Sequence, residues 1–227
     1  SAEHTDYLRD ESRRTGRAEL IVFPRTEADI RAALQAAAVQ GLTITVQGAR
    51  TGITAGAVPE GGLILNLSRM TAITGLRHDA QAGCFFVAVQ SGLVLTELRK
   101  ALHDREFPIA AWTDQSRAAL EAFRKAGPFF FPPDPTETSA SIGGMVACNA
   151  SGACSFHYGP TRRYVEALRI LLPDGDTLIL RRGLQRATGR AFRLTTETGR
   201  VIQGPLPAYA MPAVKNRVWG SPALLPL

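Results

Sequence analysis

The sequence predicts an α+β fold with two lobes, a small parallel α/β lobe and a larger, mostly antiparallel lobe that also carries helices. Three observations support this prediction. Strand and helix patterns alternate over residues 20–67, which is typical of parallel strands connected through a helix. Later apolar segments are joined by short turns, which favours antiparallel pairing. Two glycine-rich segments, residues 47–58 and 131–152, interrupt these patterns and are the candidates for a ligand site.

One helix and three strands make up the predicted first lobe. An apolar run at residues 20–23 predicts the first strand. Thr26 precedes acidic residues that suit a helix N-terminus, and apolar residues then recur on one face up to Gly41, so we expect a helix between them. Residues 42–46 and 63–67 predict the second and third strands.

The predicted second lobe contains more strands and at least two helices. We expect strands at 85–89, 164–172, 177–180, 192–196 and 200–203, and helices at 93–103 and 116–126. The last two strands, joined through Thr198 and Gly199, predict a hairpin. A stretch of small residues starting at Ile142 predicts a further helical segment.

These elements predict a division of the chain into three segments. We place an N-terminal segment at residues 1–23, the first lobe at 24–73 and the second lobe at 74–227.

Composition and charge exclude several classes of protein. The net charge is +6, and basic residues gather between positions 162 and 200 without the regular aromatic interleaving typical of nucleic-acid binding, so we expect a solvated or partner-facing surface and no nucleic-acid partner. No apolar run approaches the ~20 residues that span a bilayer. We therefore expect no transmembrane segment and, without an apolar signal core, a cytoplasmic location. Cys84, Cys148 and Cys154 match no metal-ligand spacing, so we expect no metal site.

The first glycine-rich segment follows a predicted strand and repeats glycine at positions 48, 52 and 56. It lacks the G-x-G-x-x-G fingerprint of dinucleotide-binding folds and the Walker A ending. Arg50, Thr51 and Thr54 add hydrogen-bond donors that suit a diphosphate. The structural alternative is a long glycine-rich turn beneath a neighbouring strand.

The second glycine-rich segment begins with prolines that fix the backbone direction and continues with hydroxyl-bearing and small residues. A helix start at Ile142 among small residues favours docking of a phosphate or of an aromatic ring edge. Asn149 carries both a donor and an acceptor for the edge of a heterocycle. The structural alternative is a capped helix packed tightly through Gly143 and Gly144, and both descriptions are compatible. Two such loops, far apart in sequence, indicate one long anionic cofactor bound from two sides.

The order of these motifs resembles the FAD-binding domain of the vanillyl-alcohol-oxidase (PCMH-type) flavoprotein superfamily. QGARTGITAGAV after LTITV, PPDPTETSASIGG, NASG and PDGDTL carry the resemblance over roughly residues 24–212. They are most similar to the D-lactate dehydrogenase and glycolate oxidase FAD-linked subunit branch. The resemblance implies that FAD is the cofactor, with its diphosphate at the first segment and its flavin at the second.

The resemblance also assigns individual residues to the cofactor, with Ile202 on its adenine side. The cofactor-binding residues that it implies are Gln47, Gly48, Ala49, Arg50, Thr51, Gly52, Ile53, Gly56, Ala57, Pro135, Thr136, Ser139, Ser141, Ile142, Gly143, Gly144, Ala147, Asn149, Gly152 and Ile202. Lys215 and Asn216 match a further family position near the flavin. Of the four histidines, His157 is the candidate nearest a cofactor, but a structural role is favoured and no catalytic residue is assigned.

The sequence departs from the family in three places. No histidine lies between positions 5 and 77, where some members attach flavin covalently, so we expect dissociable FAD. Residues 111–127 look like an insertion. The Gly-Ser-Glu-Gly-Thr run and the substrate domain of the family are missing, so we expect the substrate to be bound through an absent domain or a partner subunit, and the chain to be an oligomer or a subunit of a complex.

The resemblance implies an FAD-linked oxidoreductase that oxidises a 2-hydroxy acid of the D-lactate or glycolate type by hydride transfer to flavin, incomplete in this chain. Two alternatives stay open. One is a non-catalytic interaction module that keeps the flavin-binding fold. The other is an NADPH-dependent reductase of a cell-wall precursor with the same fold.

Overall fold

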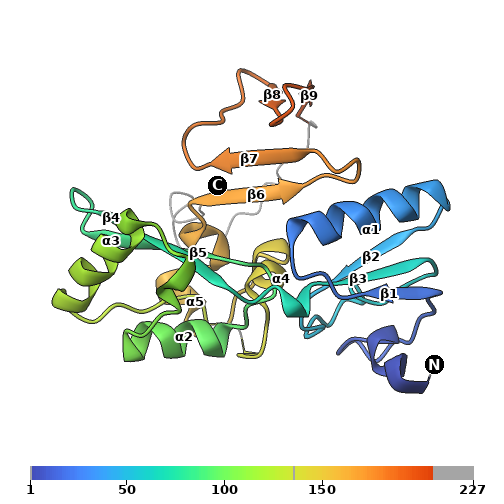
Figure 1. Ribbon diagram of the computed structural model, residues 1–227, viewed down its shortest axis with the longest axis horizontal. Helices are drawn as coiled ribbons and strands as arrows, with labels where there is room; N and C mark the ends of the chain where they lie inside the picture. Colours follow the sequence, from blue (N-terminus) through green and yellow to red (C-terminus); the bar gives the residue numbers. More distant parts are fainter. Residues whose placement is uncertain (1, 135, 207–227) are drawn as a thin grey trace, which may run out of the picture.

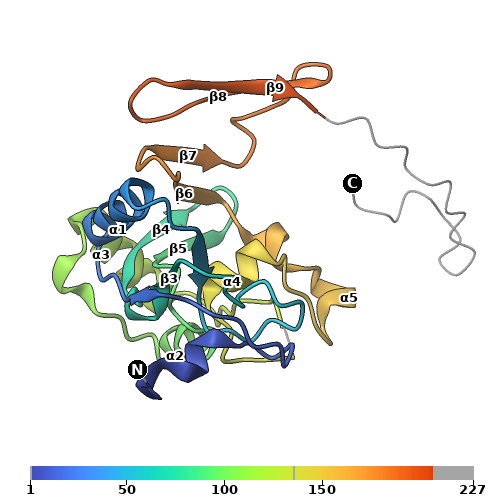
Figure 2. The ribbon, with the colours of Figure 1, turned by 90° about the vertical axis from the view of Figure 1, so that its right-hand side faces the viewer.

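The computed structural model describes residues 2–134 and 136–206, and its elements form two lobes with a pair of hairpins above them. The strands are β1 (Leu20–Val22), β2 (Ile44–Gln47), β3 (Leu63–Asn66), β4 (Ile73–Asp79), β5 (Cys84–Val89), β6 (Ala167–Leu171), β7 (Thr177–Arg181), β8 (Ala191–Thr195) and β9 (Val201–Pro205). The helices are α1 (Glu27–Val39), α2 (Leu95–Asp104), α3 (Asp114–Lys125), α4 (Ile142–Ala147) and α5 (Ser155–Tyr158). In Figures 1 and 2 the hairpins β6–β7 and β8–β9 lie on the same side of both lobes.

The first lobe is a three-stranded parallel sheet with one helix on it. Thr26 caps α1: its Oγ1 accepts from Asp29 N at 3.1 Å, and the Asp29 carboxylate accepts from Thr26 N at 3.0 Å. The strand order is β1-β3-β2, because β3 pairs in parallel with both neighbours. Leu34 of α1 belongs to the same buried cluster as Leu63 and Leu65 of β3, which gives this lobe its own core.

The core of the second lobe is formed by β4, β5 and the helices α2, α3 and α4. β4 and β5 pair antiparallel, and the side chains of Leu95, Leu120, Phe123 and Met145 are at most 1% exposed. The helices bring apolar faces to this core from three separate parts of the chain. Burial of these side chains is the main stabilising contribution to the lobe.

The segment at residues 111–127, which looked like an insertion, is part of this core. It contains the whole of α3, whose first turn is capped by Thr113 through a 3.2 Å bond from Ser116 N. The Trp112 side chain is 4% exposed, and its Nε1 donates to the Ile73 carbonyl of β4 at 2.8 Å. The segment therefore covers the β4–β5 hairpin.

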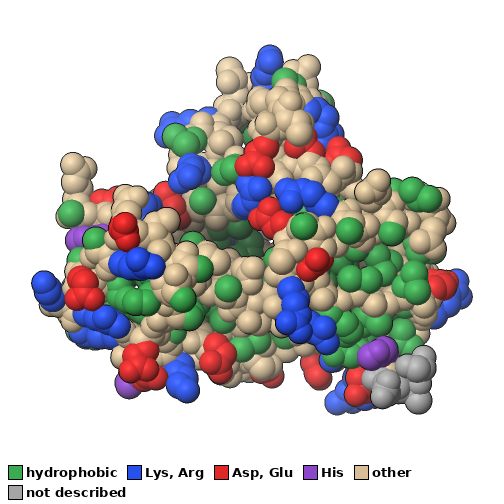
Figure 3. Space-filling view, viewed as in Figure 1, with side chains coloured by type: hydrophobic (Ala, Val, Ile, Leu, Met, Phe, Trp, Pro, Cys, Tyr) green, Lys and Arg blue, Asp and Glu red, His purple; other side chains and the backbone are tan. Residues whose placement is uncertain are grey.

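The β6–β9 arm, residues 167–205, is tied to the first lobe by charged side chains. Arg169 of β6 pairs with Glu27 of α1 at 2.8 Å and with Glu197, between β8 and β9, at 2.5 Å. Arg31 of α1 also donates to Thr177 Oγ1 at 3.0 Å. The space-filling view shows side chains of both charges gathered where the arm meets the lobes (Figure 3). Polar contacts therefore hold much of this junction.

The predicted fold class is confirmed by the parallel first sheet and by the antiparallel pairs that follow it. The expected strand at 164–172 is shorter, because residues 161–164 form a 3₁₀ turn and β6 begins only at Ala167. β4 was not predicted, since Gly75 and the polar residues after it obscure the apolar alternation. The proposed segment boundaries at 23 and 73 stay predictions. Among the described residues, no helix has the length and apolar character needed to cross a membrane.

Candidate cofactor-binding site

The two glycine-rich loops meet at Gly48 and Ser141. Gly48 follows the last residue of β2, and Ser141 caps α4. A Cβ atom placed on Gly48 would lie 2.1 Å from Ser141 Oγ, a distance that no real side chain tolerates. A bridge between Val94 and Ser141 joins the second loop to the start of α2. Glycine at position 48 is therefore required by the close approach of the two loops.

The buried side chain of Gln47 holds the first loop in place through hydrogen bonds. Its side chain is fully buried, and its Nε2 donates to the carbonyls of Tyr7 and Ala57, both at 2.7 Å. Its Oε1 accepts from Asn66 Nδ2 at 3.2 Å. Because these bonds join the two ends of the loop to β3, the polar atoms of the Gln47 side chain act on the loop and not on a ligand.

The backbone of the first loop keeps donors available. The N–H groups of residues 49–56 donate to no acceptor within the described parts of the chain. Gly52, Ile53 and Gly56 are exposed. Arg50 is the only charged residue between positions 47 and 58. An exposed loop with unpaired N–H groups, one cation and no carboxylate of its own is suited to an anion.

The first N–H groups of α4 have hydrogen-bond acceptors within the protein. Ile142 N donates to the Leu93 carbonyl at 2.7 Å, and Gly143 N donates to the Ser91 carbonyl at 2.8 Å. Gly144 N donates to the capping hydroxyl of Ser141 at 3.3 Å. These three donors are used within the protein and are not free for a phosphate. Docking of an aromatic ring edge beside this helix start stays a prediction.

Gly143 shows how close this packing is. A Cβ atom on Gly143 would lie 2.6 Å from the Cβ of Ser91. The glycine therefore lets α4 lie directly on the turn that precedes α2. The alternative of a tightly packed, capped helix is what the structure shows, and it places the second loop next to the first.

The remaining predicted residues of the second loop lie in and around α4. Asn149 adopts a left-handed backbone conformation (φ 45°), and its Oδ1 accepts from Arg162 N at 3.0 Å. Gly152 N donates to Ser155 Oγ at 2.7 Å. The other described members are exposed, and these are Thr136, Ser139 and Ala147. Pro135, Lys215 and Asn216 lie outside the described residues.

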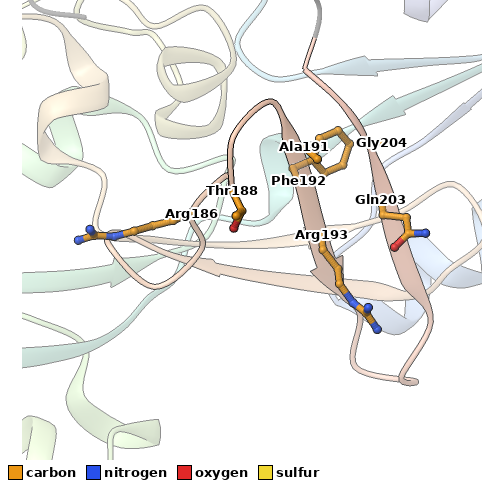
Figure 4. A pocket seen from close by; sticks show the side chains of 7 residues that line it. All are labelled: Arg186, Thr188, Ala191, Phe192, Arg193, Gln203 and Gly204. Carbon is orange, nitrogen blue, oxygen red and sulfur yellow. The ribbon is translucent and has the colours of Figure 1, made fainter.

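Ile202 is separated from the two loops. It lies in β9, paired with Leu194 of β8, and the hairpin projects away from the lobes in Figures 1 and 2. A surface pocket on this hairpin is lined by Phe192, Arg193 and Gln203 among others, as Figure 4 shows. The described structure therefore joins 47–57 with 136–152 but not with Ile202.

The histidine side chains make local contacts. His157 is exposed in α5, and its ring lies edge-on to Tyr158 with centroids 4.6 Å apart. His78 stacks on Phe85 at 4.3 Å, and His103 contacts Asp104 at 2.9 Å. None of these contacts assigns a catalytic role.

Sequence reasoning missed the contribution of the N-terminal segment. Tyr7 and Asp10 both contact the first loop. The Tyr7 carbonyl accepts a hydrogen bond from Gln47 Nε2, and the Asp10 carboxylate accepts one from Ala57 N at 3.4 Å. The Asp-x-Ser sequence at position 10 is the available signal, because an aspartate that accepts from the N–H two residues later is typical of a tight turn.

The fold and the paired loops define a flavin-binding domain. The chain belongs to the FAD binding domain family, whose model matches residues 18–119 and 115–181. FAD is the cofactor of this family.

Several of the similar curated proteins are named D-lactate or D-2-hydroxyglutarate dehydrogenases. D-lactate dehydrogenase of Anaerostipes hadrus is 32% identical over 178 residues, covering 77% of this chain and 32% of the relative. D-2-hydroxyglutarate dehydrogenase of Haemophilus influenzae is 33% identical over 164 residues, covering 70% of this chain and 13% of the relative. The chain thus spans a third or less of the length of these relatives.

Solved structures confirm the fold. 6-Hydroxy-D-nicotine oxidase from Arthrobacter nicotinovorans aligns with a TM-score of 0.57 at 18% identity, covering 78% of this chain and 34% of that one. Xylooligosaccharide oxidase from Myceliophthora thermophila C1 aligns with a TM-score of 0.57 at 18% identity, covering 80% and 33%.

The residues of the first loop fit the diphosphate of FAD. Its N–H groups without acceptors are of the kind that binds phosphate oxygens, and the small residues leave space for the backbone to approach. The Gly48–Ser141 contact leaves the second loop beside the first, as one cofactor bound by both loops requires.

Proposed function

We propose that this chain is the cofactor-holding part of an FAD-linked oxidoreductase that oxidises a 2-hydroxy acid of the D-lactate or D-2-hydroxyglutarate type. The observation that carries the proposal is the meeting of the two loops at Gly48 and Ser141, with the unpaired N–H groups of residues 49–56 beside it. The names of the relatives supply the substrate class.

In this proposal the two loops bind different parts of FAD. Residues 49–56 bind the diphosphate through backbone N–H groups, and Arg50 adds positive charge. The second loop, from Thr136 to Gly152, borders the flavin and excludes water from one side. FAD, when bound, accepts the hydride that the substrate loses.

We further propose that FAD is held without a covalent bond. No histidine lies between positions 5 and 77, and the first loop contains no cysteine, so the loop has no side chain suited to a covalent link with flavin. Groups that bind the substrate carboxylate and remove its hydroxyl proton are attributed to a part of the family outside the matched segment, or to a partner subunit.

The test is an absorbance spectrum of the purified chain after incubation with FAD and desalting. A flavin band near one equivalent that is released on denaturation supports the proposal, and a band that survives denaturation contradicts the non-covalent mode. No retained flavin and no change in FAD fluorescence on titration would reject FAD binding and favour the non-catalytic module. The substrate class is tested on the chain together with the further domain or partner subunit that supplies the substrate-binding groups, where bleaching of the bound flavin by D-lactate or D-2-hydroxyglutarate under anaerobic conditions supports it.

A further inference from the structure

The N-terminal strap, residues 4–17, forms a compact turn outside the matched family segment, which begins at residue 18. Gly16 N donates to the Leu8 carbonyl at 2.7 Å, and Arg9 and Thr15 form an antiparallel bridge. At the tip, Arg13 N donates to the Asp10 carbonyl at 3.2 Å. The strap is therefore held as a defined structure by its own backbone bonds.

The strap contacts both ends of the first glycine-rich loop. At the start of the loop, Glu11 N donates to the Arg50 carbonyl at 3.3 Å. At the end of the loop, Ala57 N donates to Asp10 Oδ2 at 3.4 Å, and Arg17 N donates to the Pro59 carbonyl at 3.0 Å. The N–H groups between these ends have no acceptor among the described residues, so the strap contacts the loop without using those donors.

A contact between Arg50 of the first loop and Tyr7 also joins the loop to the strap. The Arg50 backbone is left-handed (φ 60°), a conformation that non-glycine residues seldom adopt without support from surrounding contacts. Its guanidinium carbon lies 4.3 Å from the centre of the Tyr7 ring, and Tyr7 packs edge-on against Phe23 at 5.1 Å. The ring thus holds the side chain of the residue at which the loop turns.

Asp10 is the central residue of the strap. It is only 7% exposed, and its two carboxylate oxygens accept from different segments, Oδ1 from Ser12 N at 2.9 Å and Oδ2 from Ala57 N. Burial opposes ionisation, but the hydrogen bonds from Ser12 and Ala57 outweigh it and hold the pKa of Asp10 below its usual range. The carboxylate therefore joins the strap turn to the end of the loop.

We infer that the strap positions the diphosphate-binding loop, with Asp10 and Tyr7 as the positioning residues that hold the N–H groups of residues 49–56 toward an anionic ligand. This inference rests on the proposed function, because the ligand in question is the diphosphate of FAD. It extends the binding unit to residues before the matched domain. Neither side chain is assigned a contact with FAD.

The test compares Asp10→Asn with Asp6→Asn in the full chain. Asp10→Asn keeps the shape but places an NH₂ group opposite one of two N–H donors, so one bond must break. Asp6 is an exposed residue whose carboxylate pairs with Arg9 at 2.8 Å, and no other partner of Asp6 is found within the described part of the chain, which makes it the matched control. FAD affinity is measured by quenching of flavin fluorescence, and amide hydrogen exchange is followed without and with FAD.

We expect Asp10→Asn to weaken FAD binding by about tenfold, because the loop is no longer preorganised. Protection of the Ala57 amide falls before FAD is added, while protection in α2 and α3 stays as in the wild type. Asp6→Asn matches the wild type in both measurements. Equal or tighter FAD binding by Asp10→Asn, with unchanged exchange at Ala57, would overturn the inference.

A second variant keeps the inference testable if Asp10→Asn does not fold. Tyr7→Leu keeps an apolar contact for Phe23 but removes the ring beneath Arg50, and we expect it to weaken FAD binding by about fivefold with the core unchanged. Undiminished binding by Tyr7→Leu would overturn the role of Tyr7. If the wild-type chain itself does not bind FAD, the proposed function fails, and the exchange data alone decide whether the strap orders the loop.

Discussion

Gly48 and Ser141 touch so closely that a single added carbon on Gly48 would lie 2.1 Å from Ser141 Oγ. This contact joins the loop after β2 to the cap of α4, and so connects the two lobes at the candidate site. Gly52, four residues further along the same loop, has open space around the position of a Cβ atom. Packing therefore constrains position 48 but not position 52.

The first prediction compares Gly48→Ala with Gly52→Ala. Gly48→Ala should lower the free energy of unfolding of the FAD-free chain by about 1–3 kcal/mol, because an overpacked contact must move. Gly52→Ala should change it by no more than about 0.5 kcal/mol, since nothing is displaced. Urea unfolding followed by circular dichroism measures both. Equal effects at the two positions would contradict the loop contact.

The second prediction is a coupling between Gly48 and Ser141. Ser141→Ala alone removes the cap of Gly144 N and should destabilise the chain by about 1 kcal/mol. In the Gly48→Ala background it also removes the hydroxyl that the new methyl group meets, so the double variant should be more stable than the sum of the single changes predicts. Double-mutant cycles for residues in contact give about 0.5–3 kcal/mol, and an additive result would argue against the contact.

The third prediction concerns the segment at 111–127. Phe123 of α3 is 1% exposed, and Phe123→Ala should cost about 3–5 kcal/mol by leaving a cavity in the second-lobe core. Phe130, which is 62% exposed, is the matched control, and Phe130→Ala should cost no more than about 1 kcal/mol. Thermal unfolding of both variants distinguishes them. A small loss for Phe123→Ala would mean that α3 is peripheral.

The fourth prediction is that acid loosens the β6–β9 arm. The hydrogen bond from Arg169 is the main cause that holds the pKa of Glu27, and likewise that of Glu197, below the usual range. Because both pKa values are depressed in the folded chain, the stabilisation is complete above the usual pKa near 4.5 and is lost as pH falls through the lower, folded values. Protection factors in β8 and β9, which compare each amide with its intrinsic exchange rate at the same pH, should therefore fall below pH 4.5.

Arg169→Ala supplies the control for the acid effect. It should raise exchange in the arm already at pH 7 and make exchange there less sensitive to acid. Arg117→Ala removes an exposed pair with Asp114 within α3 and should leave the arm unchanged. An arm that responds to pH equally in the wild type and in Arg169→Ala would show that other carboxylates control it.

Local patterns were sufficient to predict most of the fold. The helix after Thr26 and the strands around it follow from a capping signal and apolar periodicity, which depend on residues a few positions apart. β4 escaped prediction because its burial alternates irregularly around Gly75, and α3 was located without its role, since packing on β4 depends on a distant segment.

Local sequence patterns also predicted part of the candidate site. The glycines at 48 and 143 marked both loops, because only a backbone without a side chain permits such close approaches. The sequence could not predict which loop has free backbone donors. The N–H groups of Ile142 and Gly143 donate to the carbonyls of residues 93 and 91, whereas the N–H groups of residues 49–56 have no acceptor among the described residues. Hydrogen-bond partners of this kind belong to the folded arrangement.

The sequence by itself determined the fold class, the positions of the two glycine-rich loops and the FAD-binding family, because these depend on local composition, spacing and family motifs. Only the tertiary structure decided that Gly48 meets Ser141, that Gln47 and Asp10 brace the first loop, and that Ile202 lies on the arm away from it. These relationships join residues far apart in the chain. They arise from packing and hydrogen bonding between segments, which no local pattern contains.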